Sequence, residues 1–206
     1  MIEPEPPAAA SLFGDRIELA REFARELGER GEELGLIGPL EAARLWSRHI
    51  LNCVLPAPLL HPGLVGDIGS GAGLPGIVLA IARPDVEFVL VEPMERRVEW
   101  LRSESTRLGL GNVRVERARA EDAPLVERLD QVTARAVSSL AKLIPITAQL
   151  ARRGGELLFM KGARVDDEVI AAAKQIRAAH LSNVEVLVLG EGIVPEATRV
   201  FRATVD

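Results

Sequence analysis

A glycine-rich turn between two apolar stretches is the feature that most limits how this chain can fold. Residues 64–68 form an apolar run that is too short for a helix, and glycines follow at positions 69, 71, 73 and 76. An apolar pattern with helical spacing begins after Pro75. This order predicts a strand, a tight turn and a helix. Because glycine adopts positive φ and lets a ligand approach the backbone, the turn predicts a small-molecule site.

Two acids near the turn indicate which ligand it binds. The glycine spacing also satisfies the dinucleotide fingerprint, and Glu92 ends the next apolar run about 20 residues on, where an acid that binds ribose is expected. Asp67, just before the glycines, would lie near a pyrophosphate, which is electrostatically unfavourable. S-adenosylmethionine carries two positive groups and no phosphate, and its carboxylate suits a helix N-terminus. We therefore expect S-adenosylmethionine, with a dinucleotide or an empty glycine turn as alternatives.

Length and composition limit the class of protein. The chain has 206 residues, of which 48% are hydrophobic, enough for one α/β domain with a modest extension. We expect one domain over residues 1–206, with a helical extension over residues 1–60 and a Rossmann-like core over residues 61–206. The net charge of −5 argues against a general, salt-driven nucleic-acid binder but leaves room for a local basic face.

The ends and the cysteine count indicate the cellular setting. Cys53 is the single cysteine, which excludes a disulfide within the chain and a cysteine metal cluster. The N-terminus is acidic and proline-rich, unlike a signal peptide, and no apolar run approaches the roughly 18 residues that cross a bilayer. These features predict a cytoplasmic protein without a membrane partner or a bound metal, and we expect a monomer.

The first third of the chain is predicted to be helical. Residues 1–10 are expected to form a frayed tail. Residues 11–35 place apolar side chains at helical spacing, with Asp15 as a candidate N-cap. A second helix is expected from Glu41 to Val54, where prolines end it. We expect these helices to pack over the ligand end of the sheet.

From residue 65 onward, strand and helix patterns alternate. The expected strands are 65–68, 88–92, 113–116, 131–134, 156–161, 184–189 and 198–204. The link at 190–196 is too short for a crossover helix, so the last two strands should pair antiparallel. The order predicts a seven-stranded, mostly parallel sheet with an antiparallel last strand and helices on both faces. This is the arrangement of the class I S-adenosylmethionine-dependent methyltransferases.

Residues that follow the strands are the candidates for ligand contact, because ligands in such sheets bind beyond the carboxyl ends of the strands. Ala120 and Glu121 follow the third strand, where a backbone N–H and a carboxylate could contact an adenine ring. Arg135 follows the fourth strand and Lys161 ends the fifth.

Arg48 and His49 lie within the second predicted helix. Neighbouring residues point about 100° apart on a helix, so the two side chains should face different surroundings. On the residue pattern alone, His49 is interpreted as a satisfied, partly buried histidine, with contact to a ligand as the alternative.

Several of these motifs resemble a family of bacterial methyltransferases that modify N7 of a guanine in small-subunit (16S) ribosomal RNA, historically called glucose-inhibited division protein B. The matching segments are Arg48 to Leu51, Asp67 to Gly76, Arg83-Pro84, Glu92 with Arg96, Arg97, Val98 and Leu101, Ala120-Glu121, Ala134 to Ala136, and Lys161-Gly162. The resemblance extends over residues 44–162. It implies a class I methyltransferase fold, S-adenosylmethionine as the cofactor, and 16S ribosomal RNA or the small ribosomal subunit as the partner.

The resemblance also implies roles for individual residues. It places Gly69, Leu74, Ala120, Glu121 and Arg135 in the S-adenosylmethionine site. Glu92 would hold the ribose there, and Asp67 and Gly71 belong to the same site by their place in the glycine turn. Arg135 is the catalytic candidate, expected to touch the cofactor carboxylate or guanine O6. The candidates for RNA contact are Arg48, His49 and Lys161.

Guanine N7 bears a lone pair and no proton, so direct displacement from the sulfonium needs no base and no covalent intermediate. Catalysis would then consist mainly of positioning, worth roughly 7 to 11 kcal/mol at its best. Two segments depart from the family. Residues 36–39 replace a usual Asn-Leu-Thr segment, and the C-terminus lacks a basic tail. The alternatives are a methyltransferase of the same fold acting on a small molecule or a protein, and a cofactor-binding regulatory module without catalysis.

Overall fold

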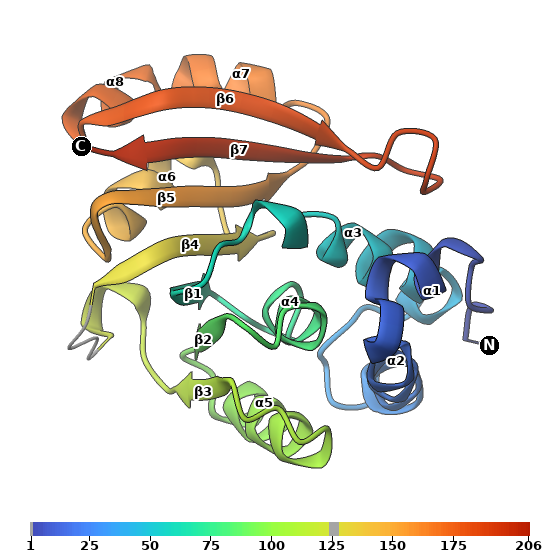
Figure 1. Ribbon diagram of the computed structural model, residues 1–206. Coiled ribbons are helices and arrows are strands. Elements are labelled where there is room, and N and C mark those ends of the chain that lie inside the picture. The colour runs from blue at the N-terminus through green and yellow to red at the C-terminus, as the bar shows by residue number, and fades with distance from the viewer. Residues whose placement is uncertain (1, 124–127) are drawn as a thin grey trace.

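The computed structural model describes residues 2–123 and 128–206, which form a central sheet covered by helices (Figure 1). The seven strands lie in the order β3-β2-β1-β4-β5-β7-β6. Their bounds are β1 Leu64–Ile68, β2 Glu87–Val91, β3 Val113–Glu116, β4 Leu129–Arg135, β5 Ala151–Lys161, β6 Leu181–Leu189 and β7 Thr198–Val205. Strands β1 to β5 pair in parallel, and β7 runs antiparallel to both β5 and β6. The predicted fold class is confirmed.

Two strands begin three or more residues earlier than their sequence pattern predicts. Strand β5 starts at residue 151 rather than 156, and β6 at 181 rather than 184. Both extensions contain polar residues or glycine, which have low strand propensity, and residues 152–154 of the first are exposed. They are strands because a neighbour pairs with them: Leu129 with Ala151, and Leu181 with Val205.

Both faces of the sheet are buried, as expected for parallel strands with helices on either side. In β2, Phe88 and Leu90 point into one apolar cluster, and Val89 and Val91 point into the other. The period of two along the strand therefore divides its side chains between two cores.

The helices cover these two faces as distinct groups (Figure 1). One face carries α1 (Ala8–Phe13), α2 (Ile17–Arg30), α3 (Leu51–Val54), α4 (Gly76–Ala82) and α5 (Glu95–Arg107). The other carries α6 (Leu140–Thr147), α7 (Val165–Ala171) and α8 (Ala173–Ala178). The N-terminal helices share one apolar cluster with α4 and the sheet. Among the described residues, no helix is long and apolar enough to span a membrane.

The N-terminal segment is packed, so the prediction of a frayed tail over residues 1–10 is wrong for its described part. Helix α1 already begins at Ala8. The Glu3 backbone N–H donates to Ala42 O at 2.9 Å, and its carboxylate accepts from the Ser47 N–H at 2.9 Å. Glu5 pairs with Arg21 at 2.6 Å. These contacts join residues far apart in sequence, which a local pattern does not show.

The helix boundaries also differ from the predictions. Asp15 lies in a 3₁₀ turn, η1 (Gly14–Arg16), and makes no capping hydrogen bond, so the predicted N-cap is wrong. The segment predicted as one helix over residues 41–54 consists of a 3₁₀ turn, η2 (Glu41–Arg44), a π-helical turn, η3 (Leu45–Ile50), and α3. π-Helical turns are frequent at functional sites, and η3 carries Arg48 and His49.

Candidate functional site

The sheet order reverses between β1 and β4, where loops leaving the two strands diverge and open a crevice. Three adjoining cavities lie there, of about 370, 290 and 610 Å³. We name them by their position. The β2 cavity is lined by Gly69, Glu92, Met94, Arg97, Ala120, Glu121 and Val137. The glycine-turn cavity is lined by Leu36 to Gly38, His49, Gly69, Gly71, Leu74, Arg97 and Arg135. The β5 cavity is lined by Arg48, Asn52, Arg135, Lys161, Thr198 and Arg199.

Ala136 borders all three cavities. Its φ is 56°, in the left-handed region that residues other than glycine rarely adopt. Such strain, of order 1–3 kcal/mol, persists where the surrounding structure imposes it and is concentrated at functional sites. Ligands bound in the three cavities would meet at this residue.

The glycine turn has the predicted conformation. Gly69, Gly71 and Gly73 have φ values of 72°, 54° and 90°. The N–H groups of Gly69 and Ser70 both donate to Val91 O, at 2.9 and 3.2 Å, which fixes the turn against β2. A β-carbon on Gly69 would lie 2.9 Å from Val137 Cγ2, where the β2 and glycine-turn cavities meet.

Replacing Gly69 with alanine should weaken cofactor binding by roughly 10-fold, because the new methyl group enters the site and the residue must keep a positive φ that costs about 1–2 kcal/mol. Gly109→Ala is the matched control, since Gly109 has φ 62° but nothing within 4 Å of an added β-carbon. Both variants should lose similar thermal stability. Calorimetric titration with S-adenosylmethionine should separate them, and equal affinities would contradict the assignment of Gly69.

Asp67 differs from its predicted role as a cofactor contact. It is fully buried, with Gly76 N–H donating to Oδ2 and Thr133 Oγ1 donating to Oδ1, each at 3.1 Å. It therefore lies below the turn and occupies the N-terminus of α4, which we had expected to receive the methionine carboxylate. This placement corrects the expectation of direct contact. A long-range attraction between Asp67 and a bound cation stays a prediction.

Stability should depend on pH through Asp67. Burial raises the pKa of Asp67 to about 6, because the folded protein favours the protonated, neutral carboxyl. The contribution of this preference to the free energy of unfolding is complete below about pH 4 and is lost as pH rises through about 6. Asparagine does not ionise. The stability of the wild type should therefore fall relative to Asp67→Asn by of order 1–3 kcal/mol between about pH 4 and pH 7. Urea unfolding at several pH values measures this, and a constant difference would contradict it.

Asp85→Asn is a control for that experiment. Asp85 is exposed, and its hydrogen bond with Arg83 lowers the pKa of its carboxyl. The stability of the wild type relative to Asp85→Asn should therefore rise slightly with pH, which is opposite in sign to the change for Asp67. The change should be small because an exposed ion pair contributes little.

Glu92 lies in the predicted position and is 2% exposed. Its carboxylate accepts hydrogen bonds from Gly71 N–H at 3.0 Å and Met94 N–H at 2.9 Å. A carboxylate offers about four lone-pair positions, so acceptor capacity remains for two hydroxyl groups of a ribose in the β2 cavity. The same bonds connect the glycine turn to the start of α5.

The β2 cavity also contains residues that the sequence analysis did not identify. Met94 and Val137 are 41% and 45% exposed and line it together with Ala120 and Glu121 of the 3₁₀ turn η5 (Ala120–Asp122). Exposed apolar side chains beside a backbone turn and a carboxylate suit a flat, partly polar ring such as adenine. The sequence signal that could have identified Met94 and Val137 is their position just after β2 and β4.

Arg97 is a third residue at these cavities to which the sequence analysis gave no role. It lines both the β2 and the glycine-turn cavities, and its Nη1 lies 3.9 Å from Glu92 Oε2. Its Nε is buried and has no hydrogen-bond partner among the described residues. With the N-terminus of α4 occupied by Asp67, Arg97 and Arg135 are the cations that can receive a carboxylate in the glycine-turn cavity.

Arg135 and His49 belong to one hydrogen-bonded group. Arg135 Nη2 lies 2.8 Å from His49 Nδ1 and donates to Arg48 O at 3.2 Å, and His49 Nε2 contacts Glu41. Burial, with the charge of Arg135 as a second cause, lowers the pKa of His49. The neutral ring therefore accepts at Nδ1 from Arg135 and donates from Nε2 to Glu41. Both ring nitrogens are satisfied, as the residue pattern predicted, and direct RNA contact by His49 stays a prediction.

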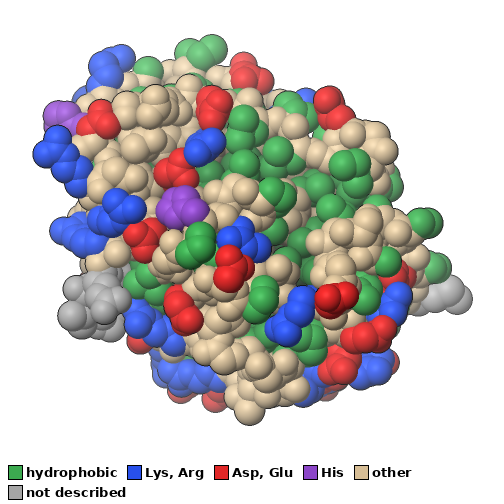
Figure 2. Space-filling model, in the orientation of Figure 1, with side chains coloured by type: hydrophobic (Ala, Val, Ile, Leu, Met, Phe, Trp, Pro, Cys, Tyr) green, Lys and Arg blue, Asp and Glu red, His purple; other side chains and the backbone are tan. Residues whose placement is uncertain are grey.

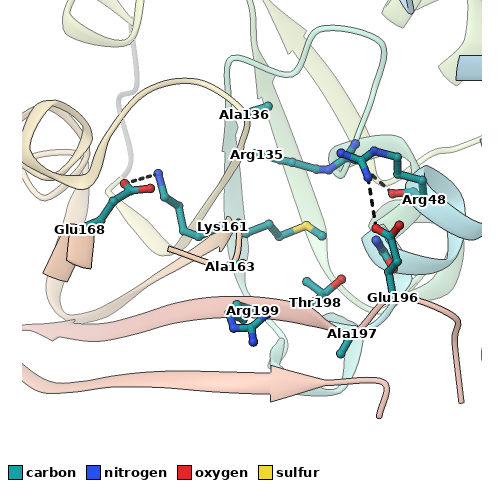
Figure 3. Close-up of a pocket in the computed structure, with 13 residues that line it drawn as sticks. Arg48, Arg135, Ala136, Lys161, Ala163, Glu168, Glu196, Ala197, Thr198 and Arg199 are labelled. Carbon is teal, nitrogen blue, oxygen red and sulfur yellow. Dashed lines mark hydrogen bonds and ion pairs between the residues drawn. The ribbon is translucent and has the colours of Figure 1, made fainter. Parts of the chain in front are cut away.

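Lys161 and Arg48 bound the β5 cavity on opposite sides (Figure 3). Lys161 Nζ lies 2.7 Å from Glu168 Oε2 and donates to Ser138 O at 2.8 Å, and its side chain is only 10% exposed. It therefore holds the loop after β4 and is not an open phosphate contact, which corrects that expectation. Arg48 is 43% exposed and pairs with Glu196 at 3.1 Å, so it remains able to meet a phosphate.

The surface charge is mixed. On the face shown in Figure 2, basic and acidic side chains are interspersed along the periphery, including the region over α2 and α5. In residues 2–123 and 128–206, no group of three or more His, Cys, Asp or Glu side chains could hold a metal ion.

Comparisons with known proteins decide the family. A family model described as GidB, rRNA small subunit methyltransferase G, matches residues 16–196. The chain belongs to the GidB family. The resemblance predicted from the motifs is confirmed, and the match extends on both sides of the segment that suggested it. Membership in GidB, a family of methyltransferases, does not favour a dinucleotide-dependent enzyme or a regulatory module.

Curated relatives in the GidB family match along almost the whole chain. The ribosomal RNA small subunit methyltransferase G of Clavibacter michiganensis subsp. michiganensis is 67% identical over 205 residues, covering 100% of this chain and 97% of the relative. The protein of the same name from Leifsonia xyli subsp. xyli is 63% identical over 204 residues, covering 99% of this chain and 98% of the relative.

Solved structures share the fold at low sequence identity. TYW2 of M. jannaschii, solved in complex with AdoMet, has a TM-score of 0.61 at 19% identity and covers 78% of this chain and 76% of its own. A SAM dependent methyltransferase from Aquifex aeolicus has a TM-score of 0.58 at 18% identity and covers 82% of this chain and 94% of its own. These likenesses agree with the class I methyltransferase fold of this GidB chain.

Proposed function

We propose that this protein uses S-adenosylmethionine to methylate N7 of one guanine in 16S ribosomal RNA. The family match over residues 16–196 carries the proposal. The cavities support it, because the β2 and glycine-turn cavities have the shape and donor set of a cofactor site, and the β5 cavity adjoins both at Ala136.

The residues present fit S-adenosylmethionine. Glu92 offers acceptors for the ribose, and Met94 and Val137 offer apolar contact for the adenine in the β2 cavity. In the glycine-turn cavity, Arg97 has a buried Nε without a hydrogen-bond partner in residues 2–123 and 128–206, and this group suits the methionine carboxylate. The bare Cα of Gly69 keeps the passage between these cavities open. No phosphate need be accommodated near Asp67.

S-adenosylmethionine supplies an electrophilic methyl group on a sulfonium. Guanine N7 already has a free lone pair, so the protein need not remove a proton. Its residues instead hold the two reactants in line and exclude water, which is worth roughly 7 to 11 kcal/mol at its best. His49 agrees with this, because both of its ring nitrogens are already hydrogen-bonded, to Arg135 and to Glu41, and neither is free to take a proton from a substrate.

The product ring is cationic, which constrains where the arginines act. Arg135 lines the glycine-turn and β5 cavities and is held by His49 and the Arg48 carbonyl. We infer that it contacts the cofactor carboxylate or guanine O6 rather than the imidazole ring. Arg48 and Arg199 at the β5 cavity suit RNA phosphate.

The test is methyl transfer from labelled S-adenosylmethionine to small subunits that lack the modification, to naked 16S ribosomal RNA, and to large subunits as the control. Label on one guanine of the small subunit or its RNA, located by mass spectrometry, supports the proposal. Transfer only to a protein or small molecule would favour the alternative, a methyltransferase of the same fold with that kind of substrate. The cytoplasmic location and the monomeric state stay predictions.

A further inference from the structure

Two residues that line the β5 cavity each have a buried side-chain oxygen without a hydrogen-bond partner among the described residues. These atoms are Asn52 Oδ1 and Thr198 Oγ1. Thr198 is 6% exposed and begins β7, and Asn52 lies on α3. Buried polar atoms in proteins are paired in about nine cases of ten. Two such oxygens on residues that line one cavity indicate a ligand that brings hydrogen-bond donors.

The cavity lies beside the expected point of methyl transfer. Ala136 joins it to both cofactor cavities, and Arg135 lines it on the same side (Figure 3). A base in this cavity can therefore present one edge to Ala136 and the opposite edge to Asn52 and Thr198. The volume of about 610 Å³ lies in the range of roughly 300 to 1,000 Å³ that is usual for ligand sites.

Guanine matches this arrangement of groups. Its Watson–Crick edge carries two donors, N1–H and the N2 amino group, and its other edge carries the acceptors N7 and O6. Two acceptor oxygens on one side of the cavity suit the first edge, and the guanidinium of Arg135 suits O6. Adenine has one donor on that edge, the N6 amino group, and an acceptor at N1, so it would leave one of the two oxygens without a donor.

We propose that the β5 cavity holds the target guanosine and that Asn52 and Thr198 read its Watson–Crick edge. This inference rests on the proposed function and adds the residues that select guanine. Because a paired guanine has no free Watson–Crick edge, the substrate must present the base unpaired or flipped out of its stack.

An exposed ion pair lines the same cavity as Asn52. Arg48 lies one helical turn before Asn52 and pairs with Glu196 across the cavity, with side chains 43% and 63% exposed (Figure 3). Exposed pairs of this kind contribute little stability. An RNA phosphate can therefore take the place of the Glu196 carboxylate on Arg48 and hold the RNA at the β5 cavity.

The first test replaces the two oxygens with apolar groups of similar size, in Asn52→Leu and Thr198→Val. Each should lower kcat/KM for RNA by roughly 10- to 100-fold and leave the affinity for S-adenosylmethionine unchanged. Asn52→Asp, which keeps an acceptor, should retain most of the activity. Thr106→Val, on the exposed surface of α5, is the control for the threonine change.

Thermal unfolding separates this role from a structural one. Removing an unpaired acceptor should leave the melting temperature equal or higher. If an ordered water satisfies Asn52 and supports the fold, Asn52→Leu should instead melt at a lower temperature. A lower melting temperature together with unchanged kcat/KM would overturn the proposal.

The second test changes the RNA. Inosine at the mapped target position lacks the N2 amino group and should lower kcat/KM for the wild type by about 10-fold. The inosine penalty should shrink in one of the two variants, Asn52→Leu or Thr198→Val. That variant is the one that lacks the oxygen which accepts from the N2 amino group. Methyl transfer with the same inosine penalty in all variants overturns this inference alone. No transfer to any RNA by the wild type overturns the proposed function and this inference with it.

Discussion

Replacing Arg135 with alanine should lower methyl transfer by roughly 100-fold or more while the fold persists. Arg135 is the cation shared by the glycine-turn and β5 cavities, so its loss affects both reactants. Removing one well-placed donor from an active site typically costs roughly 100- to 1,000-fold in rate. Label transfer to small subunits, measured at saturating S-adenosylmethionine, gives the rate.

Two controls make that result specific. Arg114→Ala removes an exposed arginine of β3 and should leave the rate unchanged. The melting temperature of Arg135→Ala should fall modestly, since the change removes two hydrogen bonds, to His49 Nδ1 and to Arg48 O, each worth about 1 kcal/mol. Near-normal turnover in Arg135→Ala would exclude the residue from the catalytic machinery.

Replacing Glu92 with alanine should weaken binding of S-adenosylmethionine by about 100-fold. A hydrogen bond to a charged group contributes about 1.5 kcal/mol or more, so two ribose hydroxyls lose about 3 kcal/mol together. The effect should be enlarged by the loosened glycine turn, because Gly71 and Met94 lose their acceptor. Calorimetry with S-adenosylmethionine and with its demethylated product measures both affinities.

Glu95→Ala is the matched control for Glu92. Glu95 lies three residues later, is exposed, and pairs with Arg117 away from the cavities. It should bind the cofactor as the wild type does. Glu92→Gln, which keeps one acceptor, should be intermediate. Unchanged affinity in Glu92→Ala would show that the ribose is held elsewhere.

The structure brings together most of the residues that the sequence predicts for the cofactor side of the site. Gly69, Gly71, Leu74, Glu92, Ala120 and Glu121 all line the β2 or the glycine-turn cavity. They were found because buried parallel strands leave short apolar runs, and the residues that follow such runs meet at one edge of the sheet. Position along the chain was therefore sufficient to locate them.

The tertiary structure decided which polar side chains near the cavities are free to bind a ligand and which are held by other residues. Asp67 turned out to cap α4, and Lys161 to be held by Glu168 and Ser138. Conversely, Arg97, Asn52 and Thr198 have buried polar atoms without a partner in the part of the chain that the structure describes, which no local pattern revealed. A hydrogen bond depends on a partner that can be distant in sequence, and burial depends on every element packed around it.

The sequence by itself therefore determined the sheet, the glycine turn and the family, since these depend on local spacing and on residue types along the chain. Only the folded structure decided how the N-terminal segment packs, which carboxylates face a ligand, and that three cavities meet at Ala136. The physical reason is that strand and turn preferences act between near neighbours, whereas the satisfaction of charges and hydrogen bonds is settled by contacts between segments remote in sequence.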